Sequence, residues 1–136
     1  MRIYNNEINF GNTTKTVLGK GYRITDEYND NNIRILHKEY DLKHDRFIRQ
    51  DKFDEKGNPI ENWWFEYSKG KQVEHFQTKD GESYVRTIIN KIVDGLQVRT
   101  EEFVSDTNPK NNYLYEITRN YEGKMLKFLC NGKSVF

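Results

Sequence analysis

The sequence contains no alanine, a single cysteine and only two prolines among its 136 residues. Because alanine is the best helix former and one of the commonest residues in proteins, its absence argues against a helical fold. The lone Cys130 excludes an internal disulfide and favours a reducing compartment. No apolar signal region follows Met1, and no apolar run approaches membrane-spanning length. We therefore expect a cytoplasmic protein.

An excess of charge of one sign is missing as well. The chain carries 22 basic and 21 acidic side chains, for a formal net charge of +1. This balance excludes a basic tail, so a nucleic-acid partner is not expected. It also removes the self-repulsion that keeps disordered chains open. Together with a full complement of large apolar side chains, it predicts one folded β-rich domain over residues 1–136.

Aromatic, β-branched and turn-forming residues are abundant instead. The chain has nine Tyr, eight Phe and fifteen Asn. Tyr, Phe, Ile and Val fit the pleated surface of a strand, and Asn tolerates a left-handed backbone in turns. Asp94-Gly95 and Asn131-Gly132 are typical two-residue hairpin turns. The sequence predicts a mainly β fold: an antiparallel β-meander of about eight to ten strands, as a twisted sheet or flattened barrel, with at most one helix.

Two segments are less clear. In residues 84–93 the apolar side chains follow both a helical stripe and a run of β-branched residues, so helix and strand both remain open and strand is preferred. The loop 105–112 is rich in Asn, Asp and Ser and is expected to be a solvated hairpin tip.

One pattern recurs along the chain: an aromatic residue, then Asp or Asn, then a polar turn and an aliphatic residue. Its best copy is Phe53-Asp54-Glu55-Lys56-Gly57-Asn58-Pro59-Ile60, after Tyr40-Asp41 and Tyr28-Asn29, with a weaker echo at Tyr121-Glu122-Gly123-Lys124-Met125. The pattern resembles the YD repeats of Rhs-type proteins and the short β-hairpin repeats of small bacterial antitoxin and immunity proteins. The resemblance covers residues 28–81 and implies no catalytic motif.

The titratable residues show no spacing that points to chemistry. His37 and His44 have Glu39, Asp41 and Asp45 nearby, which is a candidate metal site or acid–base pair. Dedicated zinc sites carry closer ligand pairs, so we interpret the histidines as polar residues on strands. Cys130 lies in aliphatic company and is expected to be a small buried hydrophobe. We predict no catalytic residue, no metal and no cofactor.

The strongest binding feature is the aromatic segment around residues 63–67, which is followed by two lysines. Aromatic side chains next to bases are typical of interfaces and of surfaces that stack nucleobases. Trp63 and Trp64 are expected on opposite faces of a strand, with one of them more exposed. The candidate binding residues are Trp63, Trp64, Tyr67, Lys69 and Lys71.

From these features we expect a non-catalytic intracellular protein-binding module. The resemblance makes a bacterial immunity or antitoxin-type protein, which blocks a toxin by occlusion, the preferred interpretation. The alternative is a small-ligand-binding β-barrel of the fatty-acid-binding or lipocalin-like sort, which would need inward aromatics around a cavity. A small enzyme that uses the region of His37 and His44 is a third hypothesis.

Overall fold

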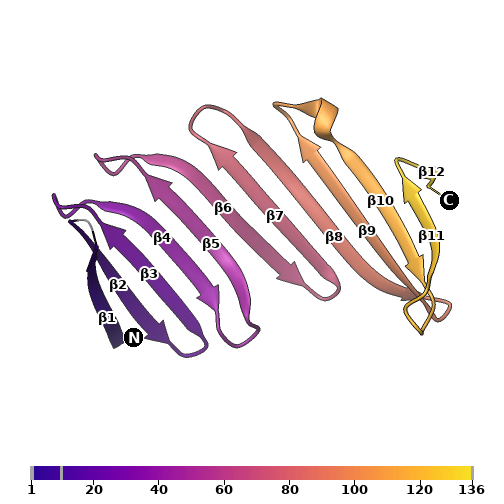
Figure 1. Ribbon diagram of the computed structural model, residues 1–136, viewed down its shortest axis with the longest axis horizontal. Coiled ribbons are helices and arrows are strands. Elements are labelled where there is room, and N and C mark those ends of the chain that lie inside the picture. Colours follow the sequence, from indigo (N-terminus) through magenta and orange to yellow (C-terminus); the bar gives the residue numbers. More distant parts are fainter. Residues whose placement is uncertain (1, 10, 136) are drawn as a thin grey trace. The chain divides into compact units, whose positions relative to one another are not determined.

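The computed structural model describes residues 2–9 and 11–135, with side chains from residue 11 onward. Its strands form one antiparallel sheet of twelve strands, in which the order in space is the order in the sequence (Figure 1). Among the described strands β1 pairs with β2 and β12 with β11, so the sheet is not closed. The predicted mainly β meander is confirmed, and of its two expected forms the sheet is the one found.

The strands are more numerous than the eight to ten expected. In chain order they are β1 (Arg2–Asn9), β2 (Asn12–Gly19), β3 (Tyr22–Tyr28), β4 (Arg34–Asp41), β5 (Arg46–Phe53), β6 (Pro59–Ser68), β7 (Lys71–Thr78), β8 (Ser83–Val93), β9 (Leu96–Ser105), β10 (Tyr113–Arg119), β11 (Met125–Cys130) and β12 (Lys133–Ser134). One short 3₁₀ helix, η1 (Pro109–Asn111), interrupts the series. Among the described residues there is no helix long and apolar enough to cross a membrane.

The chain divides into two compact units. The first comprises residues 1–65 and 76–81, and the second residues 66–75 and 82–136. Strands β2 to β5 therefore belong to the first unit and β8 to β12 to the second. The expectation that residues 1–136 form one domain stays a prediction.

Three of the turns share one hydrogen-bonding pattern. The side-chain Oδ1 of Asn29, Asp54 or Asn120 accepts the backbone N–H groups two and four residues ahead, at 2.9–3.0 Å. The residue three ahead has a left-handed backbone, which Asn and Gly adopt most easily; it is Asn32 (φ 60°), Gly57 (φ 87°) or Gly123 (φ 86°). The recurrent sequence pattern is thus a turn signal, and its last copy begins at Asn120.

The hairpin signals are confirmed. Asp94-Gly95 (φ 52° and 78°) and Asn131-Gly132 (φ 51° and 80°) have two successive left-handed residues, as a type I′ turn requires. Residues 84–93 lie in strand β8, so the strand preference is correct. The apparent helical stripe arises because both faces of β8 carry apolar side chains; Val85, for example, pairs with Val104.

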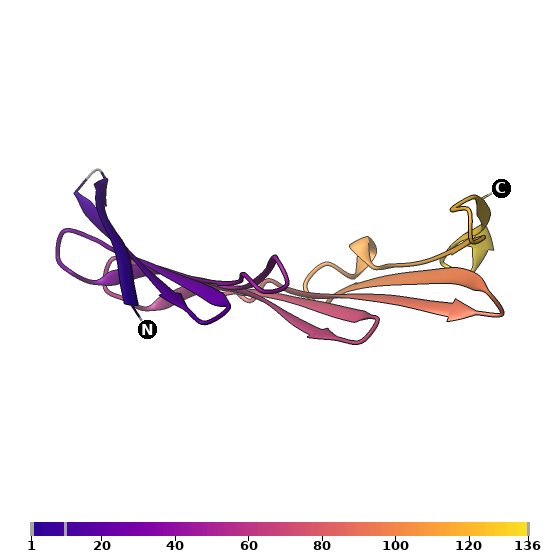
Figure 2. The same ribbon diagram turned by 90° about the horizontal axis from the view of Figure 1, so that it is seen from below.

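No hydrophobic side chain is buried among the described residues. The buried residues are polar or charged, namely Asp51, Glu74, Ser105 and Thr118. Within each unit the sheet is a single layer with no second sheet or helix packed on it, as Figures 1 and 2 show together. Neither face of the sheet is therefore covered by a second layer, and contacts between neighbouring strands replace a conventional core.

Candidate binding faces of the first unit

The register of β2 to β6 assigns side chains of the first unit to two faces, because directly paired residues point the same way. One row on the first face consists of Lys15, Asp26, His37, Asp51 and Asn62. The next row, on the opposite face, consists of Thr16, Thr25, Lys38, Gln50 and Trp63. We call the first the network face and the second the aromatic face.

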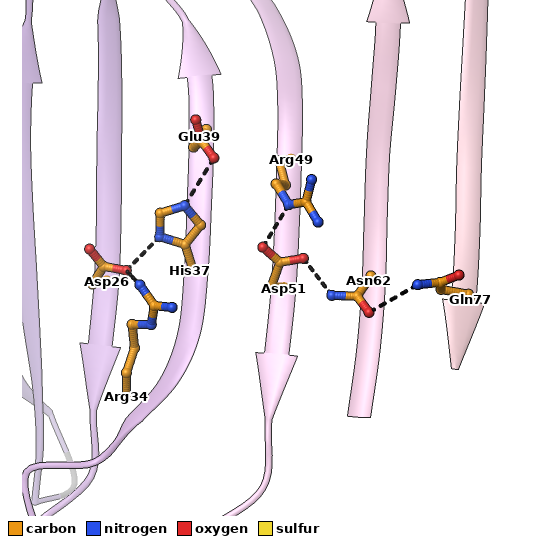
Figure 3. Close-up of polar contacts among 8 residues, drawn as sticks. All are labelled: Asp26, Arg34, His37, Glu39, Arg49, Asp51, Asn62 and Gln77. Atoms are coloured by element: carbon orange, nitrogen blue, oxygen red, sulfur yellow. Dashed lines mark hydrogen bonds and ion pairs between the residues drawn. The ribbon is translucent and has the colours of Figure 1, made fainter. Parts of the chain in front are cut away.

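His37 lies at the centre of one hydrogen-bonded group on the network face (Figure 3). Its Nδ1 is 2.6 Å from Oδ1 of Asp26, and its Nε2 is 3.0 Å from Oε2 of Glu39. Arg34 approaches the same Asp26 carboxylate at 3.5 Å. The imidazole is therefore held between two carboxylates from neighbouring positions of β3 and β4.

These contacts set the charge of His37. Partial burial, the largest single influence, lowers its pKa, but the hydrogen bonds and negative charges of Asp26 and Glu39 together outweigh it and raise the pKa above 6.5. The imidazolium form is therefore stabilised, and in this form both ring nitrogens donate. A histidine with both nitrogens occupied has no free lone pair for a metal or a proton.

A second group on the network face is centred on Asp51, which is 7% exposed. Its carboxylate accepts a hydrogen bond from Arg49 Nε at 2.8 Å and another from Asn62 Nδ2 at 2.7 Å. Asn62 in turn accepts one from Gln77 at 3.4 Å (Figure 3). The chain of contacts joins β5, β6 and β7, and it pairs the buried carboxylate with a cation and an amide.

The aromatic face carries a cluster of three rings from β5 and β6. The ring centroids of Phe47 and Trp63 are 4.7 Å apart, and those of Phe47 and Phe65 are 5.6 Å apart with an edge-on geometry. Trp63 and Phe65 are separated by 5.5 Å. All three rings are only partly buried, so the cluster presents a continuous apolar surface to solvent.

Two cations border this cluster. The guanidinium of Arg23 stands 5.1 Å from the centre of the Tyr40 ring, and Lys38 is on the neighbouring row beside Gln50. Both side chains are exposed, and neither has a carboxylate partner among the described side chains. A hollow of about 190 Å³ lies here, lined among others by Arg23, Lys38, Tyr40 and Phe47.

The structure separates the predicted binding residues. Trp63 and Trp64 point to opposite faces, as predicted: Trp63 pairs with Gln50 on the aromatic face, and Trp64 pairs with Arg49, whose guanidinium is 5.3 Å from its ring. Both are partly buried, and the expectation that one of them is more exposed stays a prediction. Tyr67, Lys69 and Lys71 belong to the second unit, where both lysines are exposed in or beside the β6–β7 turn.

The other candidate residues lie apart. His44 bonds Asp41 at 2.8 Å in the β4–β5 turn, and His75 bonds Glu66 at 3.0 Å. No cluster of three or more metal-ligating side chains occurs in the part of the chain that the structure describes. Cys130 is partly exposed, so the expectation of a buried cysteine is wrong: a single-layer sheet leaves one side of its side chain uncovered.

The second unit carries its own aromatic feature, a ladder of rings across β8 to β11. Successive centroids are 5.0, 5.4, 4.5 and 5.7 Å apart along Tyr84, Phe103, Tyr113, Tyr115 and Phe128. Arg86 lies within 5.6 Å of the Phe103 ring and pairs with the buried Glu74 at 3.0 Å. The ladder spreads ring contacts over four strands instead of concentrating them at one place.

The loop 105–112 is closed at its base. The buried Ser105 donates its hydroxyl to the Ser83 carbonyl at 3.0 Å and accepts the Asn108 N–H at 3.1 Å, and Asn112 accepts the Ser105 N–H at 2.7 Å. Residues 106–112 are exposed, which confirms the expected solvated tip.

Sequence reasoning missed Asp26, Asp51, Arg23 and Lys38. Each of these residues is recognised as a candidate only from the side chains that face it on the adjacent strand. Those neighbours are known only once the pairing register of the strands is known. Comparisons with known proteins add no candidate, because no family model, curated protein or solved structure matches this chain.

Proposed function

We propose that the protein is a non-catalytic binding module for another protein, and that it acts as an immunity or antitoxin-type protein that blocks a toxin by occlusion. The observation that carries the proposal is the aromatic face, where partly exposed rings lie beside two cations that have no carboxylate partner among the described side chains. Aromatic and arginine side chains are the residue types that dominate interface energies. A cytoplasmic location belongs to the same proposal and is supported by the single cysteine.

The titratable groups support a non-catalytic role. Both ring nitrogens of His37 are held by carboxylates, so it is not positioned to take up or deliver a substrate proton. Ser105, the most buried serine, donates its hydroxyl to the Ser83 carbonyl of β8 and accepts the Asn108 N–H of its own loop. The single-layer construction supports occlusion, because a sheet with a free face can lie against a partner without rearrangement.

The alternative of a small-ligand-binding barrel loses its main support. Such proteins enclose their ligand in a closed barrel, whereas this sheet is not closed. The resemblance to YD-repeat and hairpin-repeat proteins stays a prediction, and it supports the toxin-blocking version of the proposal.

Co-expression with the products of the two neighbouring genes tests the proposal. We expect one product to arrest growth, this protein to relieve the arrest, and the pair to purify as a complex of fixed stoichiometry by light scattering. Relief at substoichiometric amounts without a complex would indicate catalysis and overturn the occlusion mechanism. If neither product is toxic or forms a complex, the toxin-blocking role is excluded.

A further inference from the structure

The two faces of the first unit differ in how their charges are satisfied. On the network face the carboxylates of Asp26 and Glu39 are bonded to the imidazole of His37, and the carboxylate of Asp51 is bonded to Arg49. On the aromatic face Arg23 and Lys38 have no carboxylate partner among the described side chains. The evenly balanced overall charge of the chain therefore coexists with a local excess of positive charge on the aromatic face.

The carboxylates nearest to this place by register, among the described side chains, already have partners. Glu27, on the same face as Thr25, accepts a hydrogen bond from Asn12 Nδ2 at 3.1 Å. Asp45 accepts the Tyr40 hydroxyl, and Glu61 pairs with Lys52 at 3.3 Å. Glu39 lines the hollow beside Arg23 and Lys38, but its carboxylate is bonded to His37 on the network face. Arg23 and Lys38 are thus exposed beside an apolar cluster, and no carboxylate among the described side chains of this unit is bonded to either of them.

We propose that the aromatic face of the first unit is the docking surface, and that its partner is a protein segment carrying carboxylates next to large apolar side chains. This inference rests on the proposed function and specifies which surface and which partner chemistry it uses. Apolar side chains would cover Phe47, Trp63 and Phe65, and the carboxylates would meet Arg23 and Lys38. Such complementary charge fixes the orientation of a partner and accelerates its association.

Single-stranded nucleic acid has a related chemistry, because bases stack on aromatic rings beside cations. The ring geometry favours protein. Phe47 packs against both Trp63 and Phe65 at 4.7 and 5.6 Å, the latter edge-on, so the rings of this cluster cover one another's faces. Two cations are also few for tracking a phosphate backbone.

The test uses the full chain as bait for a displayed library of random dodecapeptides. We expect enriched peptides to combine Asp or Glu with Trp, Phe or Leu, and the synthetic form of the best peptide is the probe. Its Kd, measured by fluorescence anisotropy, should weaken at least about tenfold in the double variant Arg23→Glu/Lys38→Glu, as expected when charge complementarity is reversed.

The matched control is Lys127→Glu/Lys133→Glu, which changes net charge equally through two exposed lysines of the second unit. Its Kd should stay within about twofold of the parent. Circular dichroism checks that both variants remain folded, and Trp63→Phe, which keeps an aromatic ring, should weaken binding less than the charge reversal.

The remaining outcomes separate the two proposals. Peptides that bind the Arg23→Glu/Lys38→Glu variant unchanged would overturn this docking surface and leave a protein-binding function elsewhere on the chain. If oligo-dT of twenty nucleotides binds instead and is lost in that variant, the partner class is wrong. If neither peptide nor oligonucleotide binds, the docking surface is overturned, and the growth-relief experiment alone decides the proposed function.

Discussion

The two units stabilise an uncovered sheet in different ways. In the first unit the two hydrogen-bonded groups lie on the face opposite the ring cluster: Asp51 and His37 are the centres of the groups on the network face, and Phe47 is the centre of the cluster on the aromatic face. In the second unit both kinds of contact share one face. There Tyr84 and Tyr113 stack in the ladder and also donate their hydroxyls to Glu74 and Glu101.

This difference shows that a sheet without buried hydrophobic residues among its described side chains can be stabilised in two ways, by rows of hydrogen-bonded polar side chains or by stacked aromatic rings. A polar row fixes the register because each group needs one particular partner across the strand. A ring ladder contributes apolar contact over several strands and tolerates exchange between Phe and Tyr. In the first unit the hydrogen-bonded groups lie on the network face, so the aromatic face does not have to carry them.

The largest effect should come from Asp51→Ala. The change removes two hydrogen bonds from a buried carboxylate and leaves Arg49 and Asn62 without their partner, which costs about 3 kcal/mol. Urea unfolding should measure the loss, and hydrogen exchange should rise in β4–β6 but not in β9–β11. The variant Asp51→Asn, which can still accept from Asn62, should lose about half as much. Equal losses in both variants would contradict this account.

The next effect should come from Phe103→Ala in the ladder. Two ring contacts, to Tyr84 and Tyr113, disappear, which costs about 2 kcal/mol. Hydrogen exchange should now rise in β8–β10 and stay unchanged in β4 and β5, the reverse of the Asp51 result. Phe103→Tyr retains the ring and should be close to the parent. Uniform exchange changes in either case would mean that the units are not energetically distinct.

A smaller effect on stability is expected at the turn that occurs in both units, in which a side-chain Oδ1 accepts two backbone N–H groups. Asn120→Ala removes two hydrogen bonds to backbone N–H groups and should lower the free energy of unfolding by about 1 kcal/mol. Asn120→Asp should be close to neutral, since Asp54 makes the same turn in the first unit. A loss with Asp as large as with Ala would show that the two turns are not equivalent.

The smallest effect is the pH dependence of the first unit. Because the folded pKa of His37 is raised above its unfolded value, its stabilising contribution is fully present below about pH 6.5 and is lost as pH rises through the folded pKa. Chemical unfolding between pH 6 and pH 9 should show this decline, and the variant His37→Gln should flatten it. A parent curve that rises with pH over this range would contradict the assignment.

Local chemistry made the fold readable from the sequence. Asp94-Gly95 and the Asp54 turn each specify their backbone through residues that adopt left-handed conformations, and no distant contact is needed. The opposite faces of Trp63 and Trp64 followed from strand alternation alone. The exposure of Cys130 did not, because its aliphatic neighbours suggested a core that a single layer does not provide.

The candidate site was less readable. Asp26 and His37 are eleven residues apart and meet only because β3 and β4 pair in one register; a shift of one residue would put them on opposite faces. Lys38 is one of many lysines in the sequence. It stands out only because, beside the aromatic cluster, no carboxylate among the described side chains is bonded to it. Which side chains face each other on adjacent strands depends on the pairing register, and the register cannot be read from the composition of the sequence.

The order of the strands has a consequence for how the protein folds. In the described sheet each strand pairs only with its neighbours in the sequence: one for β1 and β12, and two for every other strand. Each pairing therefore closes only a short loop, and the entropy lost per closure is small and nearly constant along the chain. Such a chain should fold rapidly for a β protein, since folding rates fall as contacts become more distant in sequence. Growth can begin at any well-formed hairpin and extend by one strand at a time in either direction, as in a one-dimensional lattice of coupled sites.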